Sequence, residues 1–555
     1  MQRLLSLLLT LMFLGCAGRG LPPPAVGSAL SAAESLYAVL RDVRDQIDVA
    51  LAAGHNGIAD VTPVGPWIRS HNQLRQTIIT RLSALDSAEL EGEDRRALHL
   101  MRRTIERDID SLTPPTTSAT TQSRLAPDCS YDPQAIVALP RGLDSLRARL
   151  YACYGWAQSH VVTGGDTLDR LTILGTLGRE PDRNRRRQLF LALDPVWRSM
   201  NRNNGPASPY RTLLKAELSR QKGRLPSLAQ AAASGVPPDS LERWLLAMLE
   251  TWERSNPDSL LEPWEWYYRM GEASRRLSPG ISQERLIQLN AEVYRSLGAD
   301  LESLGVYYDV GAREGKTPVA YTTFAGRPRY INGGWRRAKP WVVATYRTGG
   351  LDNLNELLHE TGHAVHIAAI RSRPAFADWP DSDPLTEAVA DFIALEVYEP
   401  LWQQHWLGDS VPTERGLRAR YAGIIMDVAW ALFEVRVQRD PNADPNQVWT
   451  VLTRDYLRIR PHAELSWWAM RGQLVDAPGY MMNYAAGAML IAAIRERTRR
   501  LHGSFSTGDS TWYGWIAPRL FRFGLEKPSS EVIEEFLGGD VSPAAILRDM
   551  QRIGK

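Results

Sequence analysis

One helical run near the middle of the chain constrains the fold more than any other feature. His359-Glu360-Thr361-Gly362-His363 is an H-E-x-x-H motif, and apolar residues recur around it at helical spacing. Residues four apart lie on one face of a helix, so both imidazoles can reach one zinc ion. Asp352 or Asn353 is available as the N-cap. The fold must therefore place this helix where His359 and His363 point at the same ion.

An acidic pair follows in the next predicted helix. Glu387 and Asp391 stand four residues apart and so share one helix face. A catalytic zinc takes three protein ligands and keeps one position open, so we expect Glu387 to complete the set with His359 and His363. Asp391 is suited to accept the free ring N–H of a ligand histidine and to fix its tautomer.

The residue after the first imidazole is the expected general base. Glu360 lies close enough to reach a zinc-bound water, whose pKa the metal lowers towards about 7. Its carboxylate would take the proton as the water attacks a carbonyl carbon. His366 shares the metal-facing stripe but lies about 10 Å along the helix axis from His359, so we interpret it as structural.

The full pattern resembles a known group of enzymes. H-E-x-x-H, a Glu twenty-four residues after the second His and an Asp four residues later resemble the gluzincin peptidases, especially the angiotensin-converting-enzyme-like family. The string from His359 to His366 also resembles the thimet-oligopeptidase-like family, but the form Glu-Ala-x-x-Asp favours the first. The resemblance implies a mainly α-helical fold with two large lobes, a deep central cleft and one small β-sheet next to the zinc helix.

A downstream segment resembles the region where that family stabilises the transition state. The family has Lys-x-His and then Pro-Tyr-x-x-Tyr, whereas this chain has Arg471-Gly472-Gln473 and a segment from Pro478 to Tyr484. The resemblance implies that Tyr480 and Tyr484 donate to the oxyanion, and that Arg471 and Gln473 contact the substrate. Because Gln473 stands where the His would fall and the second Tyr is displaced by one, the oxyanion donors stay open. Packing aromatics and a surface arginine are the alternatives.

The N-terminus predicts export. Met1-Gln2-Arg3 precedes an apolar run too short to span a bilayer permanently. The run ends in Phe13-Leu14-Gly15-Cys16, which resembles the bacterial lipobox, where the cysteine becomes lipidated. We expect residues 1–15 to be a lipoprotein signal peptide, Cys16 to carry lipid, and residues 16–30 to be a tether. The protein would then be extracytoplasmic and membrane-anchored, on the periplasmic face or the cell surface; a plain signal peptide is the alternative.

The remaining chain divides by pattern into three parts. We expect residues 31–305 to form an N-terminal helical lobe and residues 306–495 to form the zinc catalytic region. Residues 496–555 are expected to form C-terminal helices that complete the body. Helical patterning includes the stretch from Leu139 to about Asn201. Short β-prone runs precede the zinc helix at Pro318–Phe324, Arg329–Ile331 and Trp341–Tyr346.

The charge balance and the cysteine content indicate which partners and which compartment to expect. The 65 Lys and Arg nearly balance the 63 Asp and Glu, so the net charge of +2 gives no reason to expect nucleic acid. Cys129 and Cys153 are the cysteines left after Cys16, and an oxidising compartment favours a disulfide between them. Two separate buried thiols are the alternative.

We therefore predict an enzyme with one zinc ion that hydrolyses peptide bonds in short peptides, as a peptidyl-dipeptidase or oligopeptidase. A thimet-like endo-oligopeptidase is one alternative, with the same chemistry at another cleavage position. The other is a catalytically inactive lipoprotein that binds zinc and holds peptides or partners. Glu360 argues against the inactive protein, because a binding module needs no base beside the metal.

Overall fold

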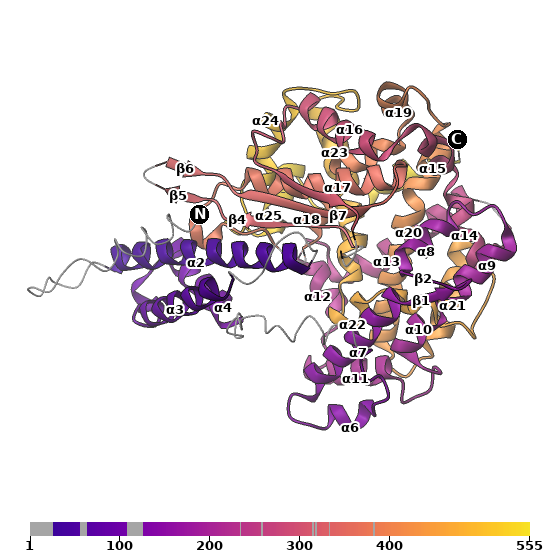
Figure 1. Ribbon diagram of the computed structural model, residues 1–555, viewed down its shortest axis with the longest axis horizontal. Coiled ribbons are helices and arrows are strands. Elements are labelled where there is room, and N and C mark those ends of the chain that lie inside the picture. The colour runs from indigo at the N-terminus through magenta and orange to yellow at the C-terminus, as the bar shows by residue number, and fades with distance from the viewer. Residues whose placement is uncertain are drawn as a thin grey trace, which may run out of the picture.

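The computed structural model describes residues 26–55, 64–107, 126–233, 235–256, 259–313, 316, 319–331, 334–380 and 383–554. It is mainly helical with a few small sheets, which confirms the predicted fold class (Figure 1). No helix among these residues is both long and apolar enough to cross a bilayer. The predicted signal peptide, Cys16 and most of the tether lie outside the described residues.

Three N-terminal helices lie together (Figure 1) and share a small core, which also includes Ala375 and Phe376. They are α2 (Val26–His55), α3 (Val64–Ser83) and α4 (Gly92–Arg107). Ion pairs attach α2 to two later segments of the chain: Arg41 to Asp378 at 2.8 Å, and Asp45 to Arg327 at 2.9 Å. This unit is therefore held by ion pairs against the segments that contain Arg327 and Asp378.

A larger helical lobe follows. Its helices are α6 (Pro133–Val137), α7 (Gly142–Ser159), α8 (Arg170–Leu177), α9 (Arg183–Leu191), α10 (Asp194–Asn201), α11 (Pro209–Arg220), α12 (Pro226–Ala233), α13 (Pro238–Ser255), α14 (Pro263–Met270), α15 (Glu272–Leu277) and α16 (Gln283–Ser296). The helical patterning predicted from Leu139 to about Asn201 is interrupted after α7. There the hairpin of β1 (Val161–Thr163) and β2 (Asp166–Leu168) turns at Gly164 and Gly165, both with positive φ.

The predicted sheet beside the zinc helix has three strands. β3 (Tyr307–Gly311) pairs in parallel with β7 (Lys339–Tyr346), and β4 (Tyr321–Gly326) pairs antiparallel with the other side of β7. The segment Arg329–Ile331 is β5, and it belongs instead to a separate hairpin with β6 (Gly334–Arg336). β4 is therefore an edge strand of the three-stranded sheet.

The second half of the chain packs the zinc helix among other helices. These are α17 (Leu351–Ala369), α18 (Pro384–Ala394), α19 (Pro400–Leu407), α20 (Thr413–Arg439), α21 (Pro445–Leu457), α22 (Gln473–Asp476), α23 (Met481–Leu501), α24 (Trp512–Ile516), α25 (Ser529–Leu537) and α26 (Ala544–Met550). Short turns of tighter or wider helix occur along the whole described chain: η1 (Ser87–Glu89), η2 (Ser278–Gly280), η3 (Pro374–Phe376), η4 (Leu395–Tyr398), η5 (Trp467–Met470) and η6 (Ala517–Phe521).

Two glycines decide how α17 is placed. A Cβ on Gly362 would lie 2.4 Å from the Ala390 oxygen, so only glycine lets α17 and α18 approach this closely. At the start of α17 the predicted cap is wrong, because Gly350 with φ 110° is the N-cap. The Leu351 N–H donates to Ser278 Oγ instead, at 3.0 Å.

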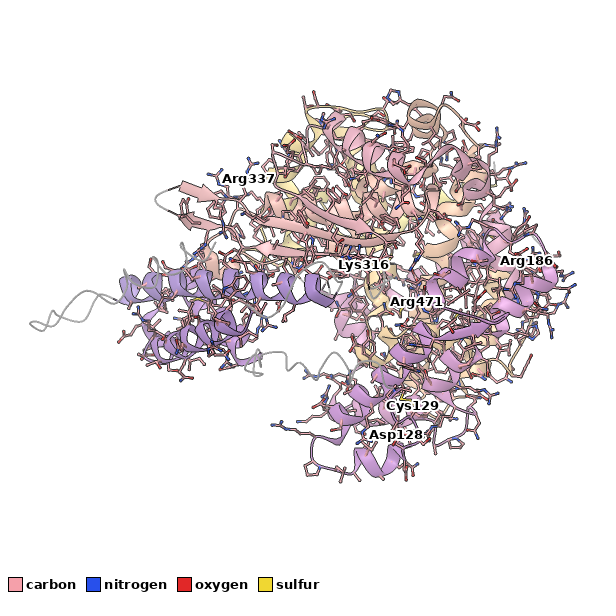
Figure 2. The ribbon with its side chains drawn as sticks, in the orientation of Figure 1. Asp128, Cys129, Arg186, Lys316, Arg337 and Arg471 are labelled. Carbon is pink, nitrogen blue, oxygen red and sulfur yellow. A yellow bond between two sulfur atoms is a disulfide. The ribbon has the colours of Figure 1, made fainter. Side chains whose placement is uncertain are left out.

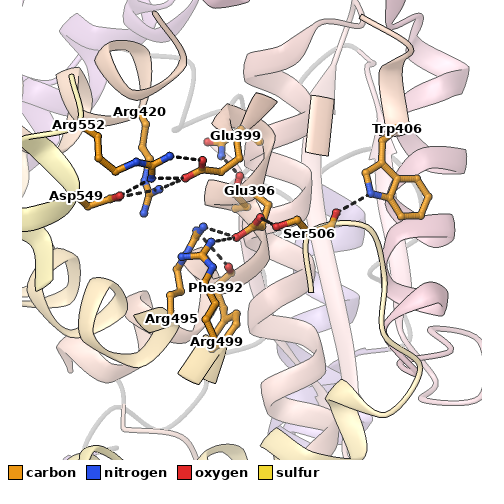
Figure 3. Close-up of polar contacts among 12 residues, drawn as sticks. Phe392, Glu396, Glu399, Trp406, Arg420, Arg495, Arg499, Ser506, Asp549 and Arg552 are labelled. Carbon is orange, nitrogen blue, oxygen red and sulfur yellow. Dashed lines mark hydrogen bonds and ion pairs between the residues drawn. The ribbon is translucent and has the colours of Figure 1, made fainter. Parts of the chain in front are cut away.

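A buried ionic network lies behind α18 (Figure 3). Glu396 on η4 pairs with Arg495 and Arg499 of α23 and accepts from Ser506 Oγ at 2.6 Å. Beside it, Glu399 pairs with Arg420 of α20 and with Arg552 near the C-terminus. Since α18 leads directly into η4, this network fixes α18 relative to α20 and α23.

Candidate metal and catalytic site

Three predicted ligands converge at the contact between α17 and α18. His359, His363 and Glu387 each offer one ligand atom, and these atoms lie within 4.8 Å of one another. His359 Nε2 is 3.6 Å from Glu387 Oε2. Two imidazoles and a carboxylate are the donor set that a catalytic zinc takes in proteins. The residues present therefore fit the predicted ion.

Asp391 orients one of these ligands. Its Oδ1 lies 2.7 Å from His359 Nδ1, which leaves Nε2 directed towards Glu387. A carboxylate on the far nitrogen of a ligand histidine fixes its tautomer and raises its basicity. The buried Nδ1 of His363 makes no hydrogen bond within the part of the chain that the structure describes.

Glu360 lies in the same pocket and is held by the sheet. Thr322 of β4 donates from Oγ1 to Glu360 Oε2 at 2.7 Å. Burial raises the pKa of Glu360 to about 7, against the opposing effects of His359 and the Thr322 hydrogen bond. A carboxylate with its pKa near neutrality is suited to take up and release a proton.

The pocket around these groups has a volume of about 360 Å³. Ala320 and the β4 residues Tyr321 and Thr322 line one part of it, together with Trp379. The Trp379 ring meets the His363 ring edge-on at 5.1 Å between centroids. Edge strand β4 therefore runs beside the three ligand residues and the expected base.

Both predicted tyrosines line this pocket. Tyr480 and Tyr484 lie at the start of α23, with ring centroids 5.5 Å apart. Burial raises the pKa of Tyr484, so its hydroxyl stays protonated and able to donate. Gln473 donates from Nε2 to the Tyr484 hydroxyl oxygen at 3.3 Å, so it reaches the pocket through that tyrosine.

Arg471 already has an ionic partner, so it is not available to bind a substrate carboxylate without competition. It pairs with Asp427 of α20, and its guanidinium lies 4.7 Å from the Trp430 ring centroid and 5.8 Å from that of Tyr484. Asp427 lines the pocket, whereas Arg471 does not. A substrate carboxylate would have to compete with Asp427 for this cation.

His366 lies apart from the ligand group. It is buried against Trp379 and Phe521, and burial lowers its pKa to about 4. A neutral packed imidazole agrees with the structural role that the helix geometry predicted.

Several residues that line the pocket were not predicted from the sequence, among them Thr322, Trp379 and Asp427. Thr322 lay within a predicted strand, but alternation alone does not show which strand is the edge. Trp379 and Asp427 carried no motif, and their roles depend on contacts with His363 and Arg471 respectively.

The predicted disulfide residues lie far from this pocket along the chain. Cys129 and Cys153 are bonded, with their Cα atoms 5.9 Å apart, at the lower end of the view in Figure 2. The bond ties the segment before α6 to α7.

No protein-family model and no curated protein matches the chain in sequence. Solved structures match its fold along nearly the whole length. PZ peptidase A with an inhibitor has a TM-score of 0.56 at 14% identity, covering 97% of this chain and 98% of that chain. An M32 carboxypeptidase from Deinococcus radiodurans has 0.54 at 13%, covering 94% and 97%. Metallocarboxypeptidase 1 of Trypanosoma cruzi has 0.51 at 14%, covering 96% and 100%.

These likenesses show the fold. The chain shares the architecture of helical metallopeptidases. The narrower resemblance to the angiotensin-converting-enzyme-like family stays a prediction.

Proposed function

We propose that this protein is a zinc-dependent peptidase that hydrolyses peptide bonds in short peptides. One observation carries the proposal: His359, His363 and Glu387 converge in the pocket that also holds Glu360, whose carboxylate Thr322 anchors. A bound zinc ion would supply Lewis-acid polarisation of water and of the scissile carbonyl. The fold shared with metallopeptidases supports the same class.

Different side chains of the pocket would have different roles in hydrolysis. Glu360 would take a proton from the attacking water and pass it to the leaving amine. Tyr480 and Tyr484 would donate to the carbonyl oxygen as negative charge develops there. The edge of β4 that faces away from β7 would align an extended peptide by main-chain hydrogen bonds, as edge strands do for added strands.

Release of dipeptides from C-termini is the narrower form of this proposal. It needs a cation that receives the terminal carboxylate, and Arg471 is already paired with Asp427. Cleavage without a terminal-carboxylate contact, as in an endo-oligopeptidase, is therefore the second candidate. Comparison of one peptide with free and with amidated C-terminus separates the two.

We also propose the extracytoplasmic, lipid-anchored location that the N-terminal sequence predicts. The disulfide between Cys129 and Cys153 supports an oxidising compartment. Mass spectrometry of the mature N-terminus tests it. An unmodified N-terminal residue other than Cys16 would contradict it.

The deciding experiment measures the zinc content of the purified protein and its cleavage of a mixed peptide library. We expect about one zinc per chain and cleavage that is lost in Glu360→Gln, because the amide cannot accept the proton. Glu250→Gln on the surface of α13 is the matched control and should cleave normally. Bound zinc without cleavage by the wild-type protein would instead indicate the inactive binding protein.

A further inference from the structure

A second cavity lies beside the zinc pocket, and we call it the apolar chamber. Its volume is about 290 Å³, and residues of α8, α14, α15, α20 and η5 line it. Ile424 and Asp427 of α20 line the zinc pocket, whereas Gly423 and Met426 line the chamber. The two hollows therefore lie against neighbouring faces of the same helix.

An ion pair joins the two hollows. Arg471 lines the chamber, its partner Asp427 lines the zinc pocket, and Tyr484 of the zinc pocket lies 5.8 Å from the same guanidinium. Figure 2 shows Arg471 near the centre of the molecule. The boundary between the zinc pocket and the chamber therefore includes this ion pair.

The lining of the chamber favours an uncharged, apolar occupant. Its charged side chains already have partners: Asp352 accepts from Ser274 Oγ at 2.7 Å, and Arg471 pairs with Asp427. Arg170 donates to Gln158 at 3.3 Å. Methionine side chains adapt readily to different apolar shapes. The apolar wall is made chiefly by Leu174, Trp266, Tyr267, Met270, Met426 and Met470.

Two exposed glycines line the chamber. Gly423 lies within α20, and a Cβ there would meet nothing within 4 Å. Gly175 lies within α8, where a Cβ would meet only Arg179 Nη2, at 3.9 Å. Glycine inside a helix costs roughly 0.5–1 kcal/mol relative to alanine. Close backbone packing does not explain either glycine, so both helices leave space that a larger residue would fill.

We propose that the apolar chamber is a side-chain subsite, which selects peptides with a large apolar or aromatic residue at one fixed position from the cleaved bond. This inference rests on the proposed peptidase function and names its substrate class. The volume suits one large side chain, since pockets for whole small molecules are commonly about 300–1,000 Å³.

A phenylalanine scan tests the subsite. The substrates are short alanine-rich peptides with a single phenylalanine at successive positions, and mass spectrometry identifies the products. The wild-type protein should cleave the series at a constant distance from the phenylalanine, with kcat/KM about tenfold or more above the all-alanine peptide. Gly423→Leu, which adds a side chain to the chamber wall without a backbone clash, should abolish this preference, measured as the ratio of kcat/KM for the phenylalanine and the all-alanine peptides on the same variant.

Gly155→Leu is the matched control, because Gly155 lies within α7, has open space at its Cβ position and lines neither hollow. It should retain the full preference. An unchanged preference in Gly423→Leu, or a wild-type protein without a preferred position, would overturn the subsite while leaving the peptidase intact.

Binding measured without turnover separates this inference from the proposed function. In the Glu360→Gln background, calorimetry should show about tenfold tighter binding of the preferred phenylalanine peptide than of the all-alanine peptide, and the difference should vanish when Gly423→Leu is added. If no peptide is cleaved but this binding difference persists, the peptidase proposal falls and the subsite stands. Equal binding of both peptides overturns the subsite.

Discussion

Thr322 on edge strand β4 donates a hydrogen bond to Glu360 on the zinc helix, over 2.7 Å between Oγ1 and Oε2. The same hydroxyl also lies 2.9 Å from the Glu360 carbonyl oxygen. The strand that would align a peptide is therefore the strand that positions the expected base. Substrate and base share one support, so a shift of β4 would move both together.

Loss of this hydroxyl should slow hydrolysis. A hydrogen bond to a charged group contributes about 1.5–3 kcal/mol, so Thr322→Val should lower kcat/KM by roughly 10- to 100-fold. Zinc content should stay unchanged, because Thr322 is not a ligand. Thr322→Ser keeps the hydroxyl and should retain most of the activity. Equal losses in the two variants would show that the methyl group, and not the hydrogen bond, matters.

Removal of the Asp391 carboxylate should weaken metal binding. Asp391→Asn replaces the acceptor that faces His359 Nδ1 at 2.7 Å, and loss of such a partner typically costs 10- to 100-fold in affinity, so we expect about that change. Competition with a chelator measures it. His366→Gln should destabilise the fold but leave zinc affinity at the wild-type value. Weaker zinc binding in His366→Gln would contradict the structural role.

The network behind α18 should matter for stability. Glu396 is 1% exposed and faces Arg495, also 1% exposed, so Glu396→Gln leaves a buried guanidinium without its counter-charge. We expect a loss of about 3–5 kcal/mol in the free energy of unfolding, measured in urea. The exposed pair of Glu496 with Arg548 is the control, and Glu496→Gln should change stability by about 1 kcal/mol or less. Similar losses at the two sites would refute the importance of burial.

Glu434 should make stability depend on pH near neutrality. Burial raises its pKa from 4.5 to about 7, although it accepts the N–H groups of Gly479 and Met481. The folded state then binds this proton more tightly than the unfolded state. The protonated Glu434 therefore makes its full contribution to the free energy of unfolding below the pKa that it has in the unfolded chain. This contribution is lost as the pH rises through about 7.

The measurement compares the wild-type protein with Glu434→Gln, which does not titrate. From about pH 5 to about pH 8 the wild-type protein should lose up to about 3 kcal/mol relative to the variant, in urea unfolding at several pH values. Other titrating groups are present in both proteins, so they cancel in the difference. Parallel stability profiles would show that Glu434 is ionised throughout.

Local spacing indicated which residues could share the candidate metal site. The positions of His359 and His363 follow from helix periodicity, and the four-residue step from Glu387 to Asp391 puts both on one face. These relations hold within one helix, so they need no knowledge of tertiary packing. The helical fold class follows from the same periodicity over a longer range.

Contacts between distant segments were not predictable in this way. The pairing of Arg471 with Asp427 joins residues 44 positions apart, and the bond from Thr322 to Glu360 depends on which strand lies at the edge. The split of the expected sheet, with β5 in its own hairpin, has the same origin. Strand pairing depends on tertiary packing across the whole chain, so the sequence of one strand does not show which strand lies next to it.

The residues of the pocket come from separate segments of the chain, and this determines when activity can appear during folding. The anchor of the base, the two imidazoles, the third ligand and the tyrosines come from four segments between Thr322 and Tyr484. A nascent or half-folded molecule has an isolated zinc helix without its carboxylate ligand or its tyrosines. Any hydrolytic activity therefore emerges only after these four segments have packed together, and other copies of the chain that are still unfolded nearby are not cleaved before then.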